Sequence, residues 1–286
     1  MENDKHILCV GEASVEFVAA QSGQPLNKVH YFHKRIGGEA ALARQIVAYG
    51  NACAFLGKIG RDGFGDTICE ALAQSQVDFS AISIDAEYET AAAFVAYRKN
   101  GRLLERQHIN HGADLYLQEK DVGLRVLEKV RLLHFSCYGL LSESARCIAS
   151  LLTWCLKKDI AVSFALREDC PLHKKVMREA IFQYLGFANI FFAESDQLSR
   201  LTGLIYPPFA VKSLFRDNPR LNEIIARDQE EVVFYNRKGE QARSTLPFGY
   251  EQDFMALYLG EHHHDKPSVA HFLRAVKQAQ QERKHD

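Results

Sequence analysis

Short apolar runs alternate with helical patterns along most of the chain. The run HILCVG at 6–11 is continuously apolar and stops at a glycine, which predicts a buried strand. A helical pattern follows at 39–49, a second apolar run at 53–60 and a second helical pattern at 67–77. Neighbouring parallel strands need a crossover connection, usually a helix, so this alternation predicts βαβ units. The sequence therefore predicts an α/β domain whose central sheet is mostly parallel.

Two segments interrupt this alternation. Segments 13–36 and 91–110 contain short alternating runs with many aromatic residues, which predict partly exposed strands. Asn100 and Gly101 lie between two such runs and predict a hairpin turn. We expect both segments to form a second, small sheet. Since the chain shows no internal repeat or low-complexity segment, we expect one domain over residues 1–286 with these strands inserted.

Charge and cysteine usage exclude several classes of protein. Lys and Arg number 35 against 36 Asp and Glu, so a formal charge of -1 gives no electrostatic reason to expect a nucleic-acid or membrane partner. The seven cysteines form no CxxC pair and lie mostly in apolar runs, which is typical of reduced, structural thiols in a cytoplasmic protein, Cys137 and Cys170 included. No apolar run has the length of a signal-peptide core or a membrane span, so we expect a soluble cytoplasmic protein.

The stretch from Gly37 to Asp66 combines a diglycine, an Ala-rich helical pattern, a strand and the sequence GKIGRDGFGD. With these glycine-bearing elements in this order and spacing, the chain resembles the PfkB (ribokinase-like) sugar kinases over roughly residues 5–280. The resemblance implies a three-layer α/β/α domain with a small β-sheet lid. The opening GEASVEF, with Glu16 where the family usually has Asp, is most similar to the ketodeoxygluconate-kinase and fructokinase branches.

The resemblance implies transfer of the ATP γ-phosphoryl group to a sugar hydroxyl, with ATP and Mg²⁺ as cofactors. In the family motif D-T-x-G-A-G-D, the last aspartate is the catalytic base, and Asp253 occupies its position. The Gly-Ala-Gly anion hole aligns with Tyr250, Glu251 and Gln252. A carboxylate about 5 Å from a phosphate charge costs roughly 3 kcal/mol at an effective dielectric of about 20, so we expect the anion hole to be degenerate.

The metal and strand-end motifs of the family are also altered. The Asn-x-x-Glu motif near the Mg²⁺ aligns with Ala193 and Asp196, with Glu194 between them, so Glu194 and Asp196 are weak candidate ligands of Mg²⁺. A family strand that ends in Thr-x-Gly aligns with residues 226–228, and the D-x-N-x-R strand end aligns with residues 165–169.

On the sugar side, the resemblance makes Glu16, Gly37, Gly38 and His108 the candidate substrate-binding residues. Alternatives stay open for several candidates. Asp253 could be a helix N-cap, Glu16 a surface charge on a lid strand, and the glycines could serve backbone geometry. The run EHHHD at 261–265 could be a zinc site or, as we expect, a solvated loop.

Three functional hypotheses follow from these residues. The first is a sugar-kinase homologue that has lost or greatly weakened ATP-dependent phosphotransfer and serves as a binding or interaction protein. The second is an active carbohydrate kinase with Asp253 as base, and the third is a sugar or metabolite sensor. The candidate small-molecule partner is a sugar or sugar acid, and we expect a homodimer formed through the aromatic-rich lid strands.

Overall fold

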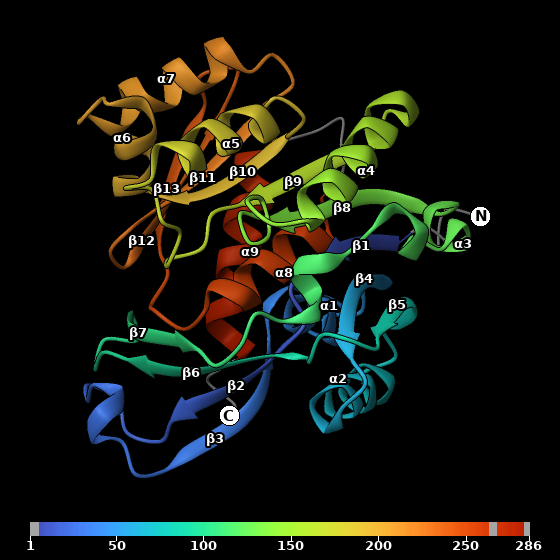
Figure 1. Ribbon diagram of the computed structural model, residues 1–286. Coiled ribbons are helices and arrows are strands. Elements are labelled where there is room, and N and C mark those ends of the chain that lie inside the picture. Colours follow the sequence, from blue (N-terminus) through green and yellow to red (C-terminus); the bar gives the residue numbers. More distant parts are fainter. Residues whose placement is uncertain (1–5, 263–267, 283–286) are drawn as a thin grey trace.

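The computed structural model describes residues 6–262 and 268–282 of the chain (Figure 1). Within these residues, nine strands form a large sheet in the order β13-β12-β11-β10-β9-β8-β1-β4-β5. Their bounds are β1 His6–Val10, β4 Cys53–Gly60, β5 Asp78–Asp85, β8 Val130–Ser136, β9 Ala161–Ala165, β10 Ile190–Glu194, β11 Glu223–Asp228, β12 Glu231–Asn236 and β13 Gln241–Thr245. All neighbouring pairs from β5 to β11 are parallel, and β12 and β13 add an antiparallel hairpin at one edge. The predicted mostly parallel sheet is confirmed.

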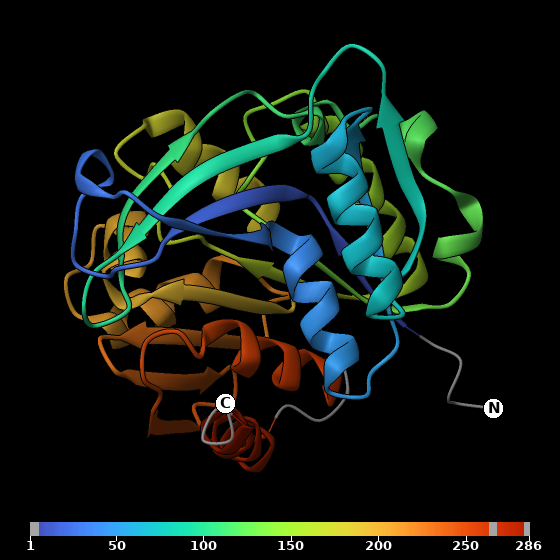
Figure 2. The same ribbon diagram turned by 90° about the horizontal axis from the view of Figure 1, so that it is seen from below.

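Helices cover both faces of the large sheet, because successive strand residues point to opposite faces and both sets are apolar. In β1, Ile7 and Cys9 join one buried cluster, whereas Leu8 and Val10 join the other. The first cluster is closed by α1 Gly38–Ala48, α2 Gly63–Gln74, α8 Glu251–Gly260 and α9 Val269–Glu282. The second is closed by α4 Ser144–Lys158, α5 Lys175–Leu185, α6 Ser195–Thr202 and α7 Pro207–Asp217. Figures 1 and 2 show the resulting three layers.

The small sheet has the order β3-β2-β6-β7 and is separate from the large one (Figure 1). Its strands are β2 Ser14–Ala19, β3 Phe32–Gly37, β6 Ala91–Tyr97 and β7 Leu103–His108. Strands β2 and β6 pair in parallel, and the other two pairs are antiparallel. Only residues 11–13 separate β1 from β2, so the small sheet lies at the edge where the parallel strands of the large sheet end.

The remaining elements are short. They are α3 Leu124–Leu127 and the 3₁₀ turns η1 Leu26–Lys28, η2 Ala113–Tyr116 and η3 Glu119–Asp121. The sequence patterns predict neither β5 nor α7, although α7 begins with two prolines, which the first turn of a helix accommodates. No helix in the described part of the chain has the length and apolar character needed to cross a lipid bilayer.

The diglycine brings the start of α1 against the connection between β1 and β2. Gly38 has φ +68°, and a Cβ atom there would lie 2.6 Å from both Cβ and the carbonyl oxygen of Glu12. A Cβ atom on Gly37 would lie 2.7 Å from the side chain of Glu16. The Ala40 N–H donates to that Glu12 carbonyl at 3.2 Å, which ties helix and connection together. Both glycines therefore have a backbone and packing reason to be glycine.

We predict that Gly38→Ala lowers the free energy of unfolding by about 3 kcal/mol, since the new methyl group meets strain at positive φ and a clash with Glu12. Gly50→Ala is the matched control, because Gly50 has φ +80° with nothing within 4 Å of a Cβ atom. The control is expected to lose about 1 kcal/mol from strain alone. Denaturant unfolding of both variants measures the difference, and equal losses would contradict the close contact with Glu12.

Candidate functional site

A cleft lies between β7 of the small sheet and the ends of β9 and β10 in the large sheet. It contains a cavity of about 390 Å³. The residues around it are mostly charged or polar: Arg102, Leu103, Leu104, Glu105, Arg106, Glu168, Asp169, Cys170, Glu194, Asp196, Gln197 and Arg200. Ligand sites of open parallel sheets lie outside the carboxyl ends of the strands, and this cavity has that position.

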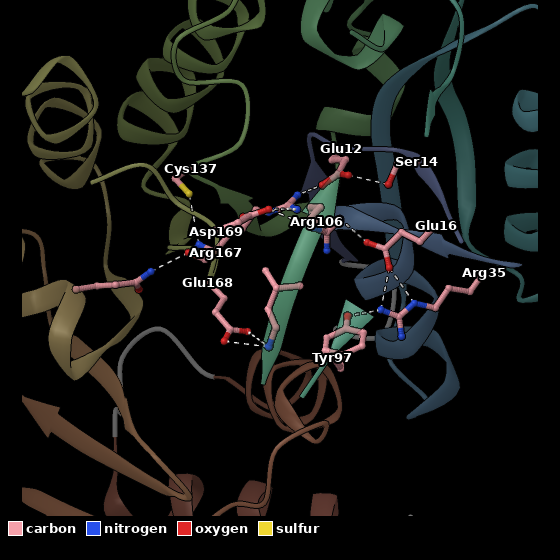
Figure 3. Close-up of polar contacts among 12 residues, drawn as sticks. Glu12, Ser14, Glu16, Arg35, Tyr97, Arg106, Cys137, Arg167, Glu168 and Asp169 are labelled. Carbon is pink, nitrogen blue, oxygen red and sulfur yellow. Dashed lines mark hydrogen bonds and ion pairs between the residues drawn. The ribbon is translucent and has the colours of Figure 1, made fainter. Parts of the chain in front are cut away.

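Five charged side chains connect the small sheet to the large sheet across this cleft (Figure 3). Glu16 of β2 pairs with Arg106 of β7 at 2.6 Å, and Arg106 pairs with Asp169 at 3.1 Å. Asp169 pairs with Arg167 at 3.1 Å, and Arg167 pairs with Glu12. We call this series, Glu16-Arg106-Asp169-Arg167-Glu12, the charge chain. Buried charges are stable only when paired and hydrogen-bonded, so these contacts support one another.

Glu16, a predicted substrate-binding residue, is only 2% exposed. One carboxylate oxygen accepts a hydrogen bond from Arg106, and the other accepts one from Arg35 at 2.8 Å. Arg35 in turn donates to the hydroxyl of Tyr97 at 2.6 Å (Figure 3). The alternative that Glu16 is a surface charge is therefore wrong. Its role in binding a substrate stays a prediction, and it would have to share its oxygens with two guanidinium groups.

His108 ends β7, two residues after Arg106 and therefore on the same face of the strand as Arg106. Its ring stacks on Tyr138 with 6.2 Å between ring centroids. Partial desolvation, followed by the positive charge of Arg106, lowers the pKa of His108 below its ordinary value, while Asp169 and Glu16 oppose that shift. The structure thus brings His108 into the electrostatic range of the charge chain, as a neutral or weakly basic ring.

Two buried carboxyl groups next to the charge chain are not predicted by the sequence. Glu39 accepts a hydrogen bond from the Glu12 N–H at 2.7 Å, and burial raises its pKa to about 7. Burial, with a contribution from Glu39, also raises the pKa of Asp114 to about 7, against a hydrogen bond from Tyr138. In the sequence, Glu39 has the position of a charge in the first turn of a helix, and Asp114 has that of a loop residue. The one sequence signal for either is that Asp114 lies in the loop that follows the candidate residue His108.

Asp253, the predicted base, is buried in the first turn of α8. Its carboxylate accepts hydrogen bonds from Gln45 and from the hydroxyl of Tyr49, the latter at 2.8 Å, and both residues belong to α1 or its C-terminal end. The N-cap of α8 is Tyr250, so the alternative that Asp253 is the N-cap is wrong. Both bonds go to the same oxygen, Oδ1, and the catalytic role of Asp253 stays a prediction.

Glu251, at the expected anion-hole position, is held by two partners. Its carboxylate accepts the N–H of Gly249 at 2.8 Å and pairs with Arg227 at 3.0 Å. Burial raises the pKa of Glu251, and the charge of Arg227 opposes that shift. The Arg227 guanidinium lies 4.2 Å from the ring centre of Phe248. A carboxylate of the protein itself therefore takes a backbone donor at the start of α8, where a helix favours an anion.

The neighbours of Glu251 differ in exposure. Tyr250 is half-buried as the N-cap, and Gln252 is exposed. Gly249, which directly precedes them, has φ +91°, so the loop retains one glycine-only turn. The predicted replacement of Gly-Ala-Gly thus places one aromatic, one acidic and one amide side chain around the first turn of α8.

The candidate Mg²⁺ ligands lie where β10 passes into α6. Glu194 pairs with Arg102 at 3.2 Å and caps α6, and burial raises its pKa to about 7 with help from Glu168 and Asp196. Asp196 is exposed and pairs with Arg200 at 3.4 Å. Carboxylate oxygens suit Mg²⁺, and a cation would relieve the repulsion that raises the pKa of Glu194. Among residues 6–262 and 268–282, no group of three or more His, Cys, Asp or Glu is arranged to hold a metal.

The histidine run at 261–265 is described only in part, because residues 263–265 lie outside the described residues. His262 is buried and hydrogen-bonds Glu223 through Nε2 at 3.0 Å, which differs from the solvated loop expected for it. Arg131 donates to the carbonyl oxygens of Gly260 and His262, the latter at 3.0 Å. These hydrogen bonds hold the end of α8 at the edge of the sheet where β8 and β11 begin, opposite the edge that forms the cleft.

Comparison with known proteins defines the family. Residues 4–246 match the model of the pfkB family carbohydrate kinases. The chain is 28% identical over 249 residues to "Probable fructokinase-5" of Arabidopsis thaliana, covering 85% of this chain and 76% of that protein. It is 26% identical over 230 residues to "Probable fructokinase-7" of the same plant, covering 77% of this chain and 66% of that protein, just under two thirds.

A solved structure shows the same fold. An E. coli protein described as a ribokinase II, in complex with ATP and Mg²⁺, superimposes with a TM-score of 0.80 and 22% identity, over 96% of this chain and 90% of that one. The chain belongs to the pfkB family of carbohydrate kinases, and the expected resemblance, with fructokinases among its relatives, is confirmed.

We predict that Glu16→Gln lowers the free energy of unfolding by about 3 kcal/mol, because it leaves Arg106 with a weaker partner in a buried site. The matched control is Glu231→Gln, which breaks a 3.0 Å pair with Arg243 in which both side chains are about half exposed. That control is expected to change stability by less than about 1 kcal/mol. Denaturant unfolding measures both, and a loss for Glu16→Gln no larger than the control would rule out a stabilising charge chain.

Proposed function

We propose that the chain is an ATP-dependent carbohydrate kinase that transfers a phosphoryl group to a hydroxyl of a sugar or sugar acid. Membership in the pfkB family and the similarity to plant sequences named as fructokinases support this activity. The observation that carries it is the polar cleft between β7 and the strand ends, which holds carboxylate and guanidinium groups next to a 390 Å³ cavity.

The sugar end of the cleft would be formed by Glu16, Arg106 and His108. Carboxylates accept hydrogen bonds from hydroxyl groups, and guanidinium groups donate to hydroxyl and carboxylate oxygens. A polyol or sugar acid entering the cleft would therefore exchange part of the charge chain for bonds to the ligand. Gly37 and Gly38 would face the ligand through their backbone atoms only, because a side chain at either position would collide with Glu12 or Glu16.

The phosphoryl end would be formed by residues at the starts of α6 and α8. Asp253 is the candidate base that would take the proton of the attacking hydroxyl, with Gln45 and Tyr49 holding its Oδ1. When bound, Mg²⁺ would neutralise the phosphate charge, and Glu194 and Asp196 would hold it. The N–H of Gly249 is a candidate donor to a phosphate oxygen once Glu251 releases it.

A second candidate function is binding of a sugar without efficient phosphotransfer, as an interaction protein or a metabolite sensor. It is favoured by the engagement of Glu251 with Gly249 and Arg227, and by the engagement of Asp253 with α1. In this case the sugar end of the cleft would keep its ligand while the phosphoryl end satisfies its own polar groups. A sensor would retain sugar affinity in the absence of nucleotide affinity.

Titration calorimetry with Mg-ATP distinguishes the two candidates. Binding at micromolar to low-millimolar concentration, followed by turnover of a sugar in a panel, supports the kinase, and Asp253→Asn should then reduce the turnover rate by about 10²-fold or more. Absence of Mg-ATP binding at several millimolar, together with binding of a sugar or sugar acid, supports the second candidate. If neither Mg-ATP nor a sugar binds, both candidate functions are overturned.

We predict that Glu251→Gln increases the affinity for Mg-ATP by about tenfold. Removing a carboxylate charge near the phosphates relieves repulsion, and the nearby Arg227 makes the gain smaller than that of an unpaired charge. Glu231→Gln serves again as control, because Glu231 is a surface residue paired with Arg243. Calorimetric titrations of both variants give the comparison. An unchanged affinity in Glu251→Gln would mean that its carboxylate does not compete with the phosphates.

We also propose a cytoplasmic homodimer that forms through the small sheet. The edge strands β3 and β7 each expose three of their six residues, and Tyr31 beside β3 is 80% exposed. Unpaired strand edges bind other strands. Light scattering at micromolar concentration should give the mass of a dimer, and Tyr31→Arg should shift it toward the monomer. A monomeric wild-type chain would contradict the proposal.

The cytoplasmic assignment is supported by seven cysteines that are all free thiols.

A further inference from the structure

Two cysteines meet at the end of neighbouring parallel strands, beside the cleft. Cys137 directly follows β8, and its N–H donates to the carbonyl of Ala165, the last residue of β9, at 2.9 Å. Beyond β9 the chain turns back, and the Cys170 N–H donates to the Arg167 carbonyl at 3.0 Å. The Arg167 N–H donates to Cys137 Sγ at 3.4 Å, a contact that Figure 3 draws. Arg167 thus contacts both cysteines, Cys137 through its N–H and Cys170 through its carbonyl, and the two thiols lie near enough for each to shift the pKa of the other.

The two thiols differ in their access to solvent. Cys137 is only 3% exposed, whereas Cys170 is partly exposed and lines the cavity together with Arg106 and Asp169. A small reagent that enters the cleft therefore reaches Cys170 first and finds Cys137 behind it. This is the arrangement of an accessible attacking thiol with a second thiol in reach.

The surroundings of the two thiols also differ in their effect on ionisation. The hydrogen bond with Cys137, followed by the charge of Arg167, lowers the pKa of Cys170 against burial and the charge of Asp169. The same hydrogen bond, with burial, raises the pKa of Cys137 well above its ordinary value. Since the thiolate is the reactive form, Cys170 has the character of the attacking group.

We propose that Cys137 and Cys170 form an oxidisable dithiol that reacts with hydrogen peroxide or a small organic hydroperoxide. The Cys170 thiolate attacks one peroxide oxygen, the O–O bond breaks, and the leaving oxygen takes a proton to depart as water or an alcohol. Cys170 is then a sulfenic acid. The Cys137 sulfur attacks the Cys170 sulfur, the S–O bond breaks, and the hydroxide leaves as water with the Cys137 proton. Two thiols are oxidised to one disulfide, and one peroxide is reduced.

The chain contains internal controls for this proposal. Cys9 and Cys53 lie 3.8 Å apart between their sulfurs on neighbouring strands, but both are buried, so proximity alone does not expose them to peroxide. Cys69 is partly exposed, but burial and Asp66 raise its pKa. Only the pair Cys137 and Cys170 combines a neighbouring thiol with an open path and a favoured thiolate, among the cysteines of the described residues. The proposal does not depend on whether the chain transfers phosphate.

The experiment treats the reduced full-length chain with one equivalent of hydrogen peroxide and measures intact mass, then maps the peptides. The expected result is loss of the mass of two hydrogen atoms and a linkage of Cys137 to Cys170. Cys170→Ser should abolish the linkage, and Cys137→Ser should leave a sulfenic acid on Cys170 that a dimedone probe captures. Cys53→Ser should behave as the wild type.

A second measurement does not depend on the folding of variants. In the wild-type chain, iodoacetamide should alkylate Cys170 about tenfold faster than Cys69 at neutral pH, and prior peroxide treatment should block alkylation of Cys170 only. Oxidation that begins at Cys69, a disulfide between Cys9 and Cys53, or conversion of Cys170 to a sulfinic acid without linkage to Cys137 would each overturn the proposal.

Discussion

The charge chain is the interaction on which the cleft depends. Glu16 and Arg106 belong to the small sheet, Arg167 and Asp169 follow the large sheet, and Glu12 lies in the connection between the two sheets. Glu12 and Glu16 are buried, so each needs its arginine as a partner, and removal of that arginine leaves an uncompensated buried charge. The small sheet is therefore held over the strand ends both by the chain connections and by these ion pairs.

The two proposed ends of the cleft are formed by different residues. At the proposed sugar end, Arg106 lines the cavity and pairs with the buried Glu16, and both groups would exchange partners with a bound polyol. At the phosphoryl end, Glu251 takes the Gly249 amide and Arg227, and Asp253 takes donors from α1. In the proposed function, a sugar would exchange part of the charge chain for its own bonds, and a nucleotide would displace the contacts of Glu251. Because different residues form the two proposed ends, sugar binding and phosphotransfer have to be measured separately.

The thiol pair adds a second chemistry to the same edge of the sheet. Arg167 donates to Cys137 Sγ through its backbone and pairs with Glu12 and Asp169 through its side chain. The turn after β9 thus carries both the cations and anions of the cleft and the accessible thiol. Sequence patterns alone favour a structural role for Cys137 and Cys170, because 32 residues separate them and neither lies in a recognised pairing motif.

Strand and helix order followed from the sequence because both faces of a covered parallel strand are apolar, so β1, β4 and β8 to β10 stand out as short buried runs. Likewise, Gly37 and Gly38 marked the start of α1, since few other residues fit there. Element β5, at the sheet edge and partly exposed, has a weaker apolar pattern, and α7 starts with two prolines that usually indicate a break. These two elements depend on tertiary packing, which a local pattern does not contain.

The candidate site divides in the same way. Sequence alone determined the residue types: a carboxylate at 16, an acidic side chain in place of a glycine at 251 and an aspartate at 253. Only the tertiary structure decided their partners, because Arg106, Arg227 and Tyr49 come from distant parts of the chain. Coulomb and hydrogen-bond energies depend on distance in space and on exclusion of water, and neither follows from position in a sequence.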